Sequence, residues 1–104
     1  MKIVICCSQG MSSSALVIKM KKYIKENQLD IEVIATTTEK AINTENDFDV
    51  LLLGPHIRTE KKRIEKVLPG KTIEVIDMKS FGRFDGEAVV RQAIEALQDR
   101  SDQA

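Results

Sequence analysis

The chain contains little of what several protein classes depend on. It has no tryptophan and one tyrosine, and its only two cysteines, Cys6 and Cys7, are neighbours in the sequence. Adjacent cysteines do not make a disulfide framework, because a bridge between neighbours is strained. The formal net charge is zero, so the chain lacks the basic balance that favours binding to nucleic acid or to an anionic membrane. No apolar run approaches the roughly 20 residues that span a bilayer, so direct membrane insertion is not expected.

The residues that are present suit one ordinary globular domain. Hydrophobic residues make up 42% of the 104 residues and charged residues 31%, a balance that can fill one hydrophobic core. We therefore expect a single domain over residues 1–104, with a frayed tail from about Ser101 to Ala104. Cysteines without a disulfide framework, four methionines and the lack of a signal peptide favour a reducing, cytoplasmic location.

One stretch near the amino terminus organises the rest of the chain. It reads Cys7, Ser8, Gln9, Gly10, Met11, Ser12, Ser13 and Ser14. It follows a β-branched run, residues 2–6, which predicts a strand buried on both faces. It precedes an amphipathic segment, beginning near Ser14, whose apolar residues recur at i, i+4, i+7 and i+8 as on one helix face. Those residues are Leu16, Met20, Tyr23 and Ile24. The stretch is therefore predicted to be a cysteine-containing phosphate-binding loop between a strand and a helix.

The chemistry of this loop centres on Cys7. Backbone N–H groups at the start of a helix, together with the helix dipole, favour an anion above the end of the strand. The same field favours thiolate over thiol at Cys7. Gly10 and the serines 12–14 also fit a plain turn and helix cap, but that backbone shape is the one that phosphate binding needs. A cysteine nucleophile inside a phosphate cradle points to a phosphoryl group carried on sulfur.

Three further apolar runs predict strands that complete a parallel sheet. They span residues 31–35, 49–53 and 72–76. Because strands alternate with helices, the predicted fold is α/β, with four parallel strands and helices on both faces. Charges at Glu32 and Glu74 suit edge strands, and right-handed crossovers then give the strand order 2-1-3-4.

The remaining helices follow from apolar spacing and from turn residues. A short helix is expected over residues 39–43, and residues 77–84 read as a loop. An amphipathic helix is expected where Ile57, Ile64, Val67 and Leu68 mark one face. Asp85 is expected to cap a last helix. The inward residues of that last helix are Val89, Ala93 and Leu97.

The strand order also predicts which residues form the rim of the site. Ligands bind at the switch point of such a sheet, which places the Cys7 loop beside Gly54, Pro55 and His56. His56, the only histidine, is read as a rim residue or first-turn helix residue, with a second phosphate carrier as the alternative. Asp77 and Asp85 are read as capping and turn residues, with a general acid as the alternative.

These motifs together resemble one bacterial protein family. The segments that carry the likeness are residues 7–14, Leu52-Leu53-Gly54-Pro55-His56-Ile57 and Val75-Ile76-Asp77. They are similar to the IIB component of the phosphoenolpyruvate-dependent sugar phosphotransferase system, in its lactose/cellobiose family. The resemblance covers essentially the whole chain. It departs from the family at Gln9, where a small residue is common, and at His56, where another polar residue is common. At Cys6 the family usually has an ordinary strand residue, and we interpret Cys6 as buried core.

The resemblance implies a protein-phosphohistidine–sugar phosphotransferase that works through phosphocysteine at Cys7. The phosphoryl group would come from a IIA protein and pass to a sugar held by the membrane component IIC. No cofactor or metal is implied, and a monomer suits a chain that exposes one face to two partners in turn. The chain would be cytoplasmic and would reach the membrane only through IIC. Cellobiose, other β-glucosides, chitobiose and lactose all stay open as the sugar.

Other functions remain as alternatives. A low-molecular-weight tyrosine phosphatase or an arsenate reductase also places a cysteine loop after the first strand, but the phosphatase pattern C-x5-R would put an arginine where this chain has Ser13. Arsenate reductase chemistry would need thiols beyond Cys6 and Cys7. A non-enzymatic domain that signals its phosphorylation state stays open. A flavin-binding module is disfavoured by the loop sequence and by the low aromatic content.

Overall fold

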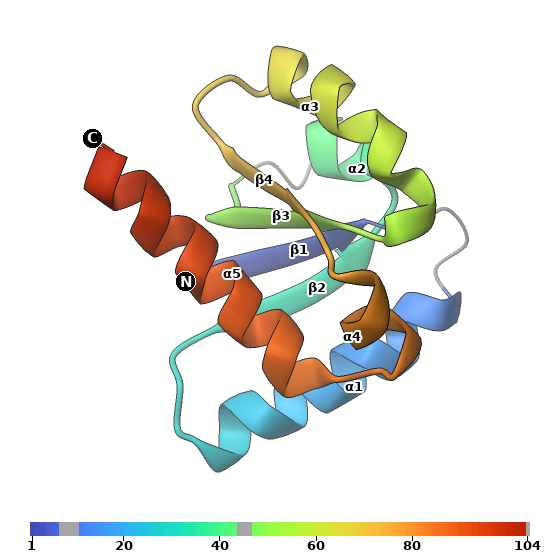
Figure 1. Ribbon diagram of the computed structural model, residues 1–104, viewed down its shortest axis with the longest axis vertical. Helices are drawn as coiled ribbons and strands as arrows, with labels where there is room; N and C mark the ends of the chain where they lie inside the picture. The colour runs from blue at the N-terminus through green and yellow to red at the C-terminus, as the bar shows by residue number, and fades with distance from the viewer. Residues whose placement is uncertain (7–10, 44–46, 104) are drawn as a thin grey trace.

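A sheet of four parallel strands forms the centre of the computed structural model, which describes residues 1–6, 11–43 and 47–103 (Figure 1). The strands are β1 (Lys2–Cys6), β2 (Glu32–Thr36), β3 (Val50–Leu53) and β4 (Thr72–Val75). Their order across the sheet is β2-β1-β3-β4, and every neighbouring pair is parallel, as the sequence predicts. The chain thus folds as a single α/β domain.

Burial explains why the strands take this order. Four of the five residues of β1 and all four residues of β3 are buried, so these two strands need cover on both faces and both edges. The edge strands β2 and β4 carry the charges: Glu32 is exposed and Glu74 is partly exposed. The predicted edge role of these two glutamates is therefore confirmed.

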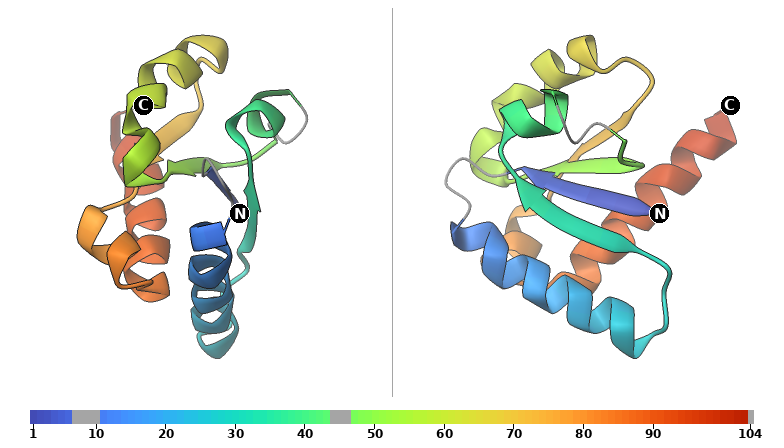
Figure 2. Two further views of the ribbon diagram at one scale, coloured as in Figure 1. Left: turned by 90° about the vertical axis from the view of Figure 1, so that its right-hand side faces the viewer. Right: turned by 180° about the vertical axis from the view of Figure 1, so that it is seen from behind.

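Helices cover the two faces of the sheet in pairs (Figure 2). One face holds α1 (Met11–Glu26) and α5 (Gly86–Gln103), which pack on Ile3 and Ile5 of β1. The other face holds α2 (Thr38–Asn43) and α3 (Lys61–Val67), which pack on Val4 and Cys6 of the same strand. The alternation along β1 therefore divides the interior into two hydrophobic clusters, one for each pair of helices.

The predicted inward faces of the long helices are largely confirmed. Leu16 and Met20 are fully buried, Ile24 nearly so, and Tyr23 packs partly buried against the same cluster. In α5, Val89 and Ala93 are buried and Leu97 is partly buried. The start of α1 at Met11 lies before the predicted start near Ser14, so the serines 12–14 belong to the helix backbone.

The predicted helix over residues 57–68 is wrong in its first half. A 3₁₀ helix, η1 (Pro55–Glu60), precedes α3, and Ile57 inside it has the non-helical dihedral angles φ −119° and ψ 26°. Pro55 fixes the first turn of η1 but donates no hydrogen bond, and the chain reaches regular α geometry only at Lys61. Val67 is half exposed, so the inward face of α3 rests on Ile64.

The predicted loop over residues 77–84 is also wrong, because it contains a short helix, α4 (Met78–Gly82). Asp77 caps this helix by accepting hydrogen bonds from the backbone N–H of Ser80 at 3.1 Å and from its hydroxyl at 3.3 Å. A helix of one turn and a half has too few residues to show apolar periodicity in the sequence.

The last helix is longer than the sequence predicts. Asp85 caps it as expected, since its carboxylate accepts a hydrogen bond from the backbone N–H of Ala88 at 3.1 Å. The helix then continues through Gln103, past the predicted start of a frayed tail at Ser101. Residues 87–103 contain no glycine or proline that would end the helix earlier. In the part of the chain that the structure describes, no helix has the length and apolar character to cross a membrane.

The contact between α1 and α5 depends on a glycine. A Cβ atom placed on Gly86 would lie 2.4 Å from the backbone carbonyl carbon of Lys19 and 2.5 Å from the backbone nitrogen of Met20. These are backbone atoms of α1, so they cannot move aside as a flexible side chain can. Gly86 therefore sets how closely the start of α5 approaches α1.

Replacement of Gly86 tests this contact. We expect Gly86→Ala to lower the free energy of unfolding by about 1–3 kcal/mol, because the added methyl group forces two helix backbones apart. Gly82→Ala is the matched control, since a Cβ on Gly82 meets nothing within 4 Å. Urea unfolding followed by circular dichroism measures both values. Equal stability of the two variants would contradict the assigned role of Gly86.

Candidate functional site

The end of β1 lies where the order of the strands in the parallel sheet reverses. Cys6, the last residue of β1, has Thr36 of β2 as its partner on one side and Leu53 of β3 on the other. From β1 the crossovers run outward in opposite directions, which makes this the topological switch point of the sheet. The carboxyl ends of β1 and β3 are thus the place where a ligand is expected.

The predicted nucleophile follows directly on this position. Cys7, Ser8, Gln9 and Gly10 lie outside the described residues. The backbone of Met11, Ser12, Ser13 and Ser14 forms the first turn of α1, a helix of 16 residues with no acidic residue in that turn. The positive end of the α1 dipole is therefore not offset by a carboxylate of its own first turn.

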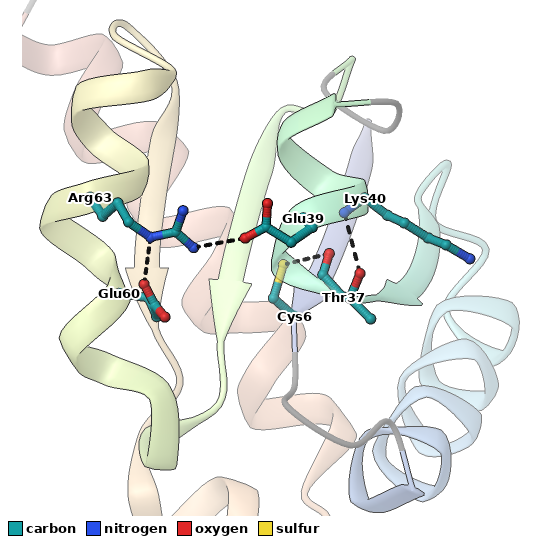
Figure 3. A network of polar contacts seen from close by, with 6 residues as sticks. All are labelled: Cys6, Thr37, Glu39, Lys40, Glu60 and Arg63. Carbon is teal, nitrogen blue, oxygen red and sulfur yellow. Dashed lines mark hydrogen bonds and ion pairs between the residues drawn. The ribbon is translucent and has the colours of Figure 1, made fainter.

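Cys6 is part of the hydrophobic interior, as the sequence predicts. Its side chain is fully buried in the cluster beneath α2 and α3, and its sulfur lies 3.9 Å from the backbone carbonyl oxygen of Thr37. Figure 3 shows the thiol pointing toward the start of α2. A thiol that is fully buried in this cluster suits packing rather than chemistry at the open end of the sheet.

Polar contacts tie α2 and α3 together above Cys6 (Figure 3). The guanidinium of Arg63 bonds the carboxylate of Glu60 at 2.7 Å and that of Glu39 at 3.2 Å. The hydrogen bond that Arg63 donates to Glu60 raises the pKa of Arg63 above its ordinary value, and the carboxylate of Glu39 adds to this effect. Thr37 caps α2 by accepting a hydrogen bond from the backbone N–H of Lys40 at 3.2 Å. The charge of Arg63 on α3 is therefore paired with carboxylates of the same chain.

The predicted rim residues lie beside the end of β1. The backbone N–H of Gly54 donates a hydrogen bond to the carbonyl oxygen of Cys6 at 3.1 Å, which continues the pairing of β3 with β1. Gly54 and Pro55 are buried, whereas His56 is exposed. Gly54 therefore lies beside the end of β1, and Pro55 and His56 follow it in the chain. That these three residues form the rim of a phosphate site stays a prediction.

The imidazole of His56 occupies a defined position on this rim. A Cβ atom on Gly54 would lie 2.7 Å from Cε1 of His56, so the ring lies against the bare glycine. The ring also contacts Phe81 of α4, with 5.7 Å between ring centroids and 53° between ring planes. Phe81 is a neighbour of the site that the sequence does not predict, because it lies on the helix that was read as a loop.

The carboxylate of Asp77 is used within its own helix. Its capping bonds go to Ser80, and its backbone N–H donates to the side-chain oxygen of Gln92 at 3.1 Å. The amide nitrogen of Gln92 in turn donates to the carbonyl oxygen of Val75 at 2.7 Å. Gln92 therefore fastens the end of β4 and the start of α4 to α5. The prediction that Asp77 serves as a cap is confirmed.

The described residues hold no metal centre that a cofactor-dependent reaction would use. Within residues 1–6, 11–43 and 47–103, no three side chains of histidine, cysteine, aspartate or glutamate come together as metal ligands would. The start of α1, a helix of 16 residues, is the described feature at this end of the sheet that favours an anion.

Comparison with known proteins gives one family. A family model described as "PTS system, Lactose/Cellobiose specific IIB subunit" matches residues 2–92. The chain is 36% identical over 98 residues to the oligo-beta-mannoside-specific EIIB component of Bacillus subtilis, covering 92% of this chain and 95% of that protein. It is also 36% identical over 98 residues to the galactose-specific EIIB component of Lactococcus lactis subsp. cremoris, covering 88% and 91%.

A solved structure has the same fold. The solution structure of the cellobiose-specific phosphotransferase IIB component protein of Borrelia burgdorferi superposes with a TM-score of 0.80 at 35% sequence identity. The superposition covers 95% of this chain and 93% of that protein.

Two substitutions of Asp77 separate a cap from a general acid. We expect Asp77→Ala to lower the free energy of unfolding by about 1 kcal/mol, because α4 loses its N-cap. Asp77→Asn should keep most of that stability, since an amide oxygen also caps, and should keep the phosphoryl-transfer rate. Urea unfolding and a transfer assay measure the two properties. A stable Asp77→Asn protein that no longer transfers phosphate would assign the carboxylate a chemical role.

Proposed function

Because the chain belongs to the lactose/cellobiose-specific IIB subunit family of the sugar phosphotransferase system, we propose that Cys7 carries the phosphoryl group between the two partners of a IIB component. EIIB components are sugar phosphotransferases that work with IIA and IIC partners. The proposal adds the atom that holds the phosphate and the route that the phosphate takes through this chain.

The first step moves the phosphoryl group onto sulfur. The thiolate of Cys7 attacks the phosphorus of the phosphohistidine on the IIA donor, so an S–P bond forms while the P–N bond breaks and the histidine nitrogen keeps the electron pair. Charge spreads over the three equatorial oxygens, and the backbone N–H groups of residues 8–14 bind those oxygens. The loop serines contribute secondary hydrogen bonds.

The second step returns Cys7 to thiolate. A hydroxyl oxygen of the sugar forms a bond to phosphorus as the S–P bond breaks, and the hydroxyl proton passes to a base. Asp77 and Asp85 serve as caps and are not free to act as that base. We propose that the base belongs to the membrane component IIC, which also binds the sugar.

The observation that carries the proposal is the place of Cys7 in the chain. β1 ends at Cys6 on the switch point, Cys7 is the next residue, and a helix of 16 residues begins at Met11. The helix dipole at that end lowers the cost of a thiolate and of a bound phosphate alike. Cys6, the other thiol, is fully buried beneath α2 and α3 and is unsuited to accept phosphate from a protein.

The sequence favours a carrier over a hydrolase. A cysteine phosphatase uses an arginine six residues after its nucleophile to stabilise phosphoryl transfer. This chain has Ser13 at that position. A phosphocysteine without that guanidinium is expected to persist until a sugar hydroxyl arrives. This persistence is what a carrier needs and what a phosphatase avoids.

The proposed setting is the cytoplasmic face of the membrane. The phosphorylated IIA protein is the donor, and a sugar bound by IIC is the acceptor. The relatives are named for an oligo-beta-mannoside, for galactose and for cellobiose at nearly equal identity to this chain, so the likeness does not select one sugar. We propose a β-glucoside such as cellobiose, the sugar named for one relative and for the superposed solved structure, with chitobiose and lactose as the alternatives.

Phosphorylation by purified phospho-IIA tests the assignment of Cys7. We expect the wild-type chain to gain the mass of one phosphoryl group, mapped to the peptide that contains Cys7. Cys7→Ser should lose the adduct, because serine at neutral pH offers no comparable anion. Cys6→Ala is the matched control and should keep the adduct, although it loses some stability through its smaller buried side chain. Intact-mass spectrometry and peptide mapping measure these results.

Three outcomes would overturn the assignment. An adduct that survives in Cys7→Ser and is lost in Cys6→Ala would move the nucleophile by one residue. A third variant, His56→Ala, should also keep the adduct, and loss of the adduct in that variant alone would make the histidine the carrier. Turnover of a phosphotyrosine analogue without any adduct would make the chain a hydrolase.

A further inference from the structure

A hollow of about 380 Å³ opens beside the rim of the site. Its lining comes from two segments that follow neighbouring strands, η1 after β3 and α4 after β4. The lining residues are Pro55, His56, Arg58, Met78, Phe81 and Gly82. In Figures 1 and 2, α4 lies at the same end of the sheet as the start of α1. The hollow is thus at the carboxyl edge, where a partner of the phosphate loop has to approach.

Several contacts hold the walls of this hollow in place. The guanidinium of Arg58 donates a hydrogen bond to the carbonyl oxygen of Pro55 at 3.2 Å. His56 is fixed between Gly54 and the ring of Phe81. The cap of Asp77 and the bonds of Gln92 fasten α4 to α5 and β4. A hollow formed before a partner arrives lowers the entropy that is lost on binding.

The rim of the hollow combines exposed apolar groups with cations. Met78, which lines the hollow, is 67% exposed, and Phe84, two residues after the lining residue Gly82, is 40% exposed. They are two of the four large hydrophobic residues that are exposed among the described residues. Lys79 and Arg83 are exposed next to the lining residues Met78 and Gly82 in the sequence, and Arg58 is part of the lining. The nearby carboxylates of Asp77 and Asp85 are used as helix caps. An apolar centre with arginine and methionine is typical of a protein interface and unusual for a surface that only faces water.

We call the surface formed by Arg58, Met78, Lys79, Phe81 and Arg83, together with the hollow, the α4 surface. We propose that the α4 surface is the docking site of the phosphorylated IIA donor, with one apolar side chain of the donor seated in the hollow. The inference rests on the proposed function. Acidic side chains of the donor around that apolar group pair with the three cations.

Charge favours the donor over the membrane acceptor as the occupant. The donor arrives with the phosphoryl group on its own histidine, so its negative charge is attracted by Arg58, Lys79 and Arg83. The acceptor meets this chain after the phosphate has moved to Cys7, and the sugar it presents carries no such charge. Transfer of the phosphoryl group to Cys7 also weakens the attraction to the spent donor, which promotes its release.

Steady-state transfer from purified phospho-IIA to this chain tests the proposal. We expect Met78→Ser to raise the KM for phospho-IIA about tenfold with kcat unchanged, because the change removes docking and leaves the loop intact. Arg58→Gln should raise the KM and flatten its dependence on salt. Val67→Ser is the matched control and should leave the KM unchanged. Val67 is an exposed apolar residue like Met78, but it lies at the end of α3, near the amino end of β4 and away from the hollow.

Each outcome of this experiment bears on one of the two proposals. A wild-type chain that accepts phosphate, with the same KM in Met78→Ser, Arg58→Gln and Val67→Ser, would overturn the α4 docking site and leave Cys7 as the carrier. An unchanged donor KM together with slower phosphorylation of sugar by IIC-containing vesicles would assign the surface to the acceptor, against the proposal. A wild-type chain that accepts no phosphate would overturn the proposed function itself.

Discussion

The structure depends on the parallel pairing of two strands that are buried on both faces. β1 and β3 expose almost no side chain, so they occupy the middle of the sheet and need helices above and below. This burial fixes the register of Cys6 against Leu53 and places the residue after Cys6 at the switch point. The same pairing brings Gly54 to the carbonyl of Cys6, and with it the rim that His56 completes. The chemistry proposed for Cys7 is thus a consequence of how the core is filled.

The sequence predicts the sheet and the main helices because these elements have long, regular patterns of apolar residues. The edge strands are recognisable because Glu32 and Glu74 interrupt otherwise apolar runs, and the predicted order depends on them. The buried state of Cys6 follows from its place in β1, where alternation points it to the cluster beneath α2 and α3. These predictions concern residues whose environment is set by burial, the strongest signal that a sequence carries.

The sequence does not predict the features that arise from contacts between distant segments. α4 is too short to have a period, and its stability comes from the Asp77 cap and from Gln92, 15 residues further along the chain. Its one local sign is an aspartate followed three residues later by Ser80. The kink at Ile57 is a local departure from helical geometry that apolar spacing cannot indicate. The contact of His56 with Phe81 joins two such segments, so no local sequence pattern predicts it.

The phosphate carrier and its docking surface are proposed to lie at the same end of one small sheet, with the phosphate held on sulfur. The most direct test is ³¹P NMR of the isolated phosphorylated chain, because the resonance distinguishes phosphorus bound to sulfur, nitrogen or oxygen. We expect one resonance from phosphorus bound to sulfur. It should disappear, as sugar phosphate forms, when IIC-containing vesicles and sugar are added. A nitrogen-bound resonance from His56, or inorganic phosphate alone, would contradict this expectation.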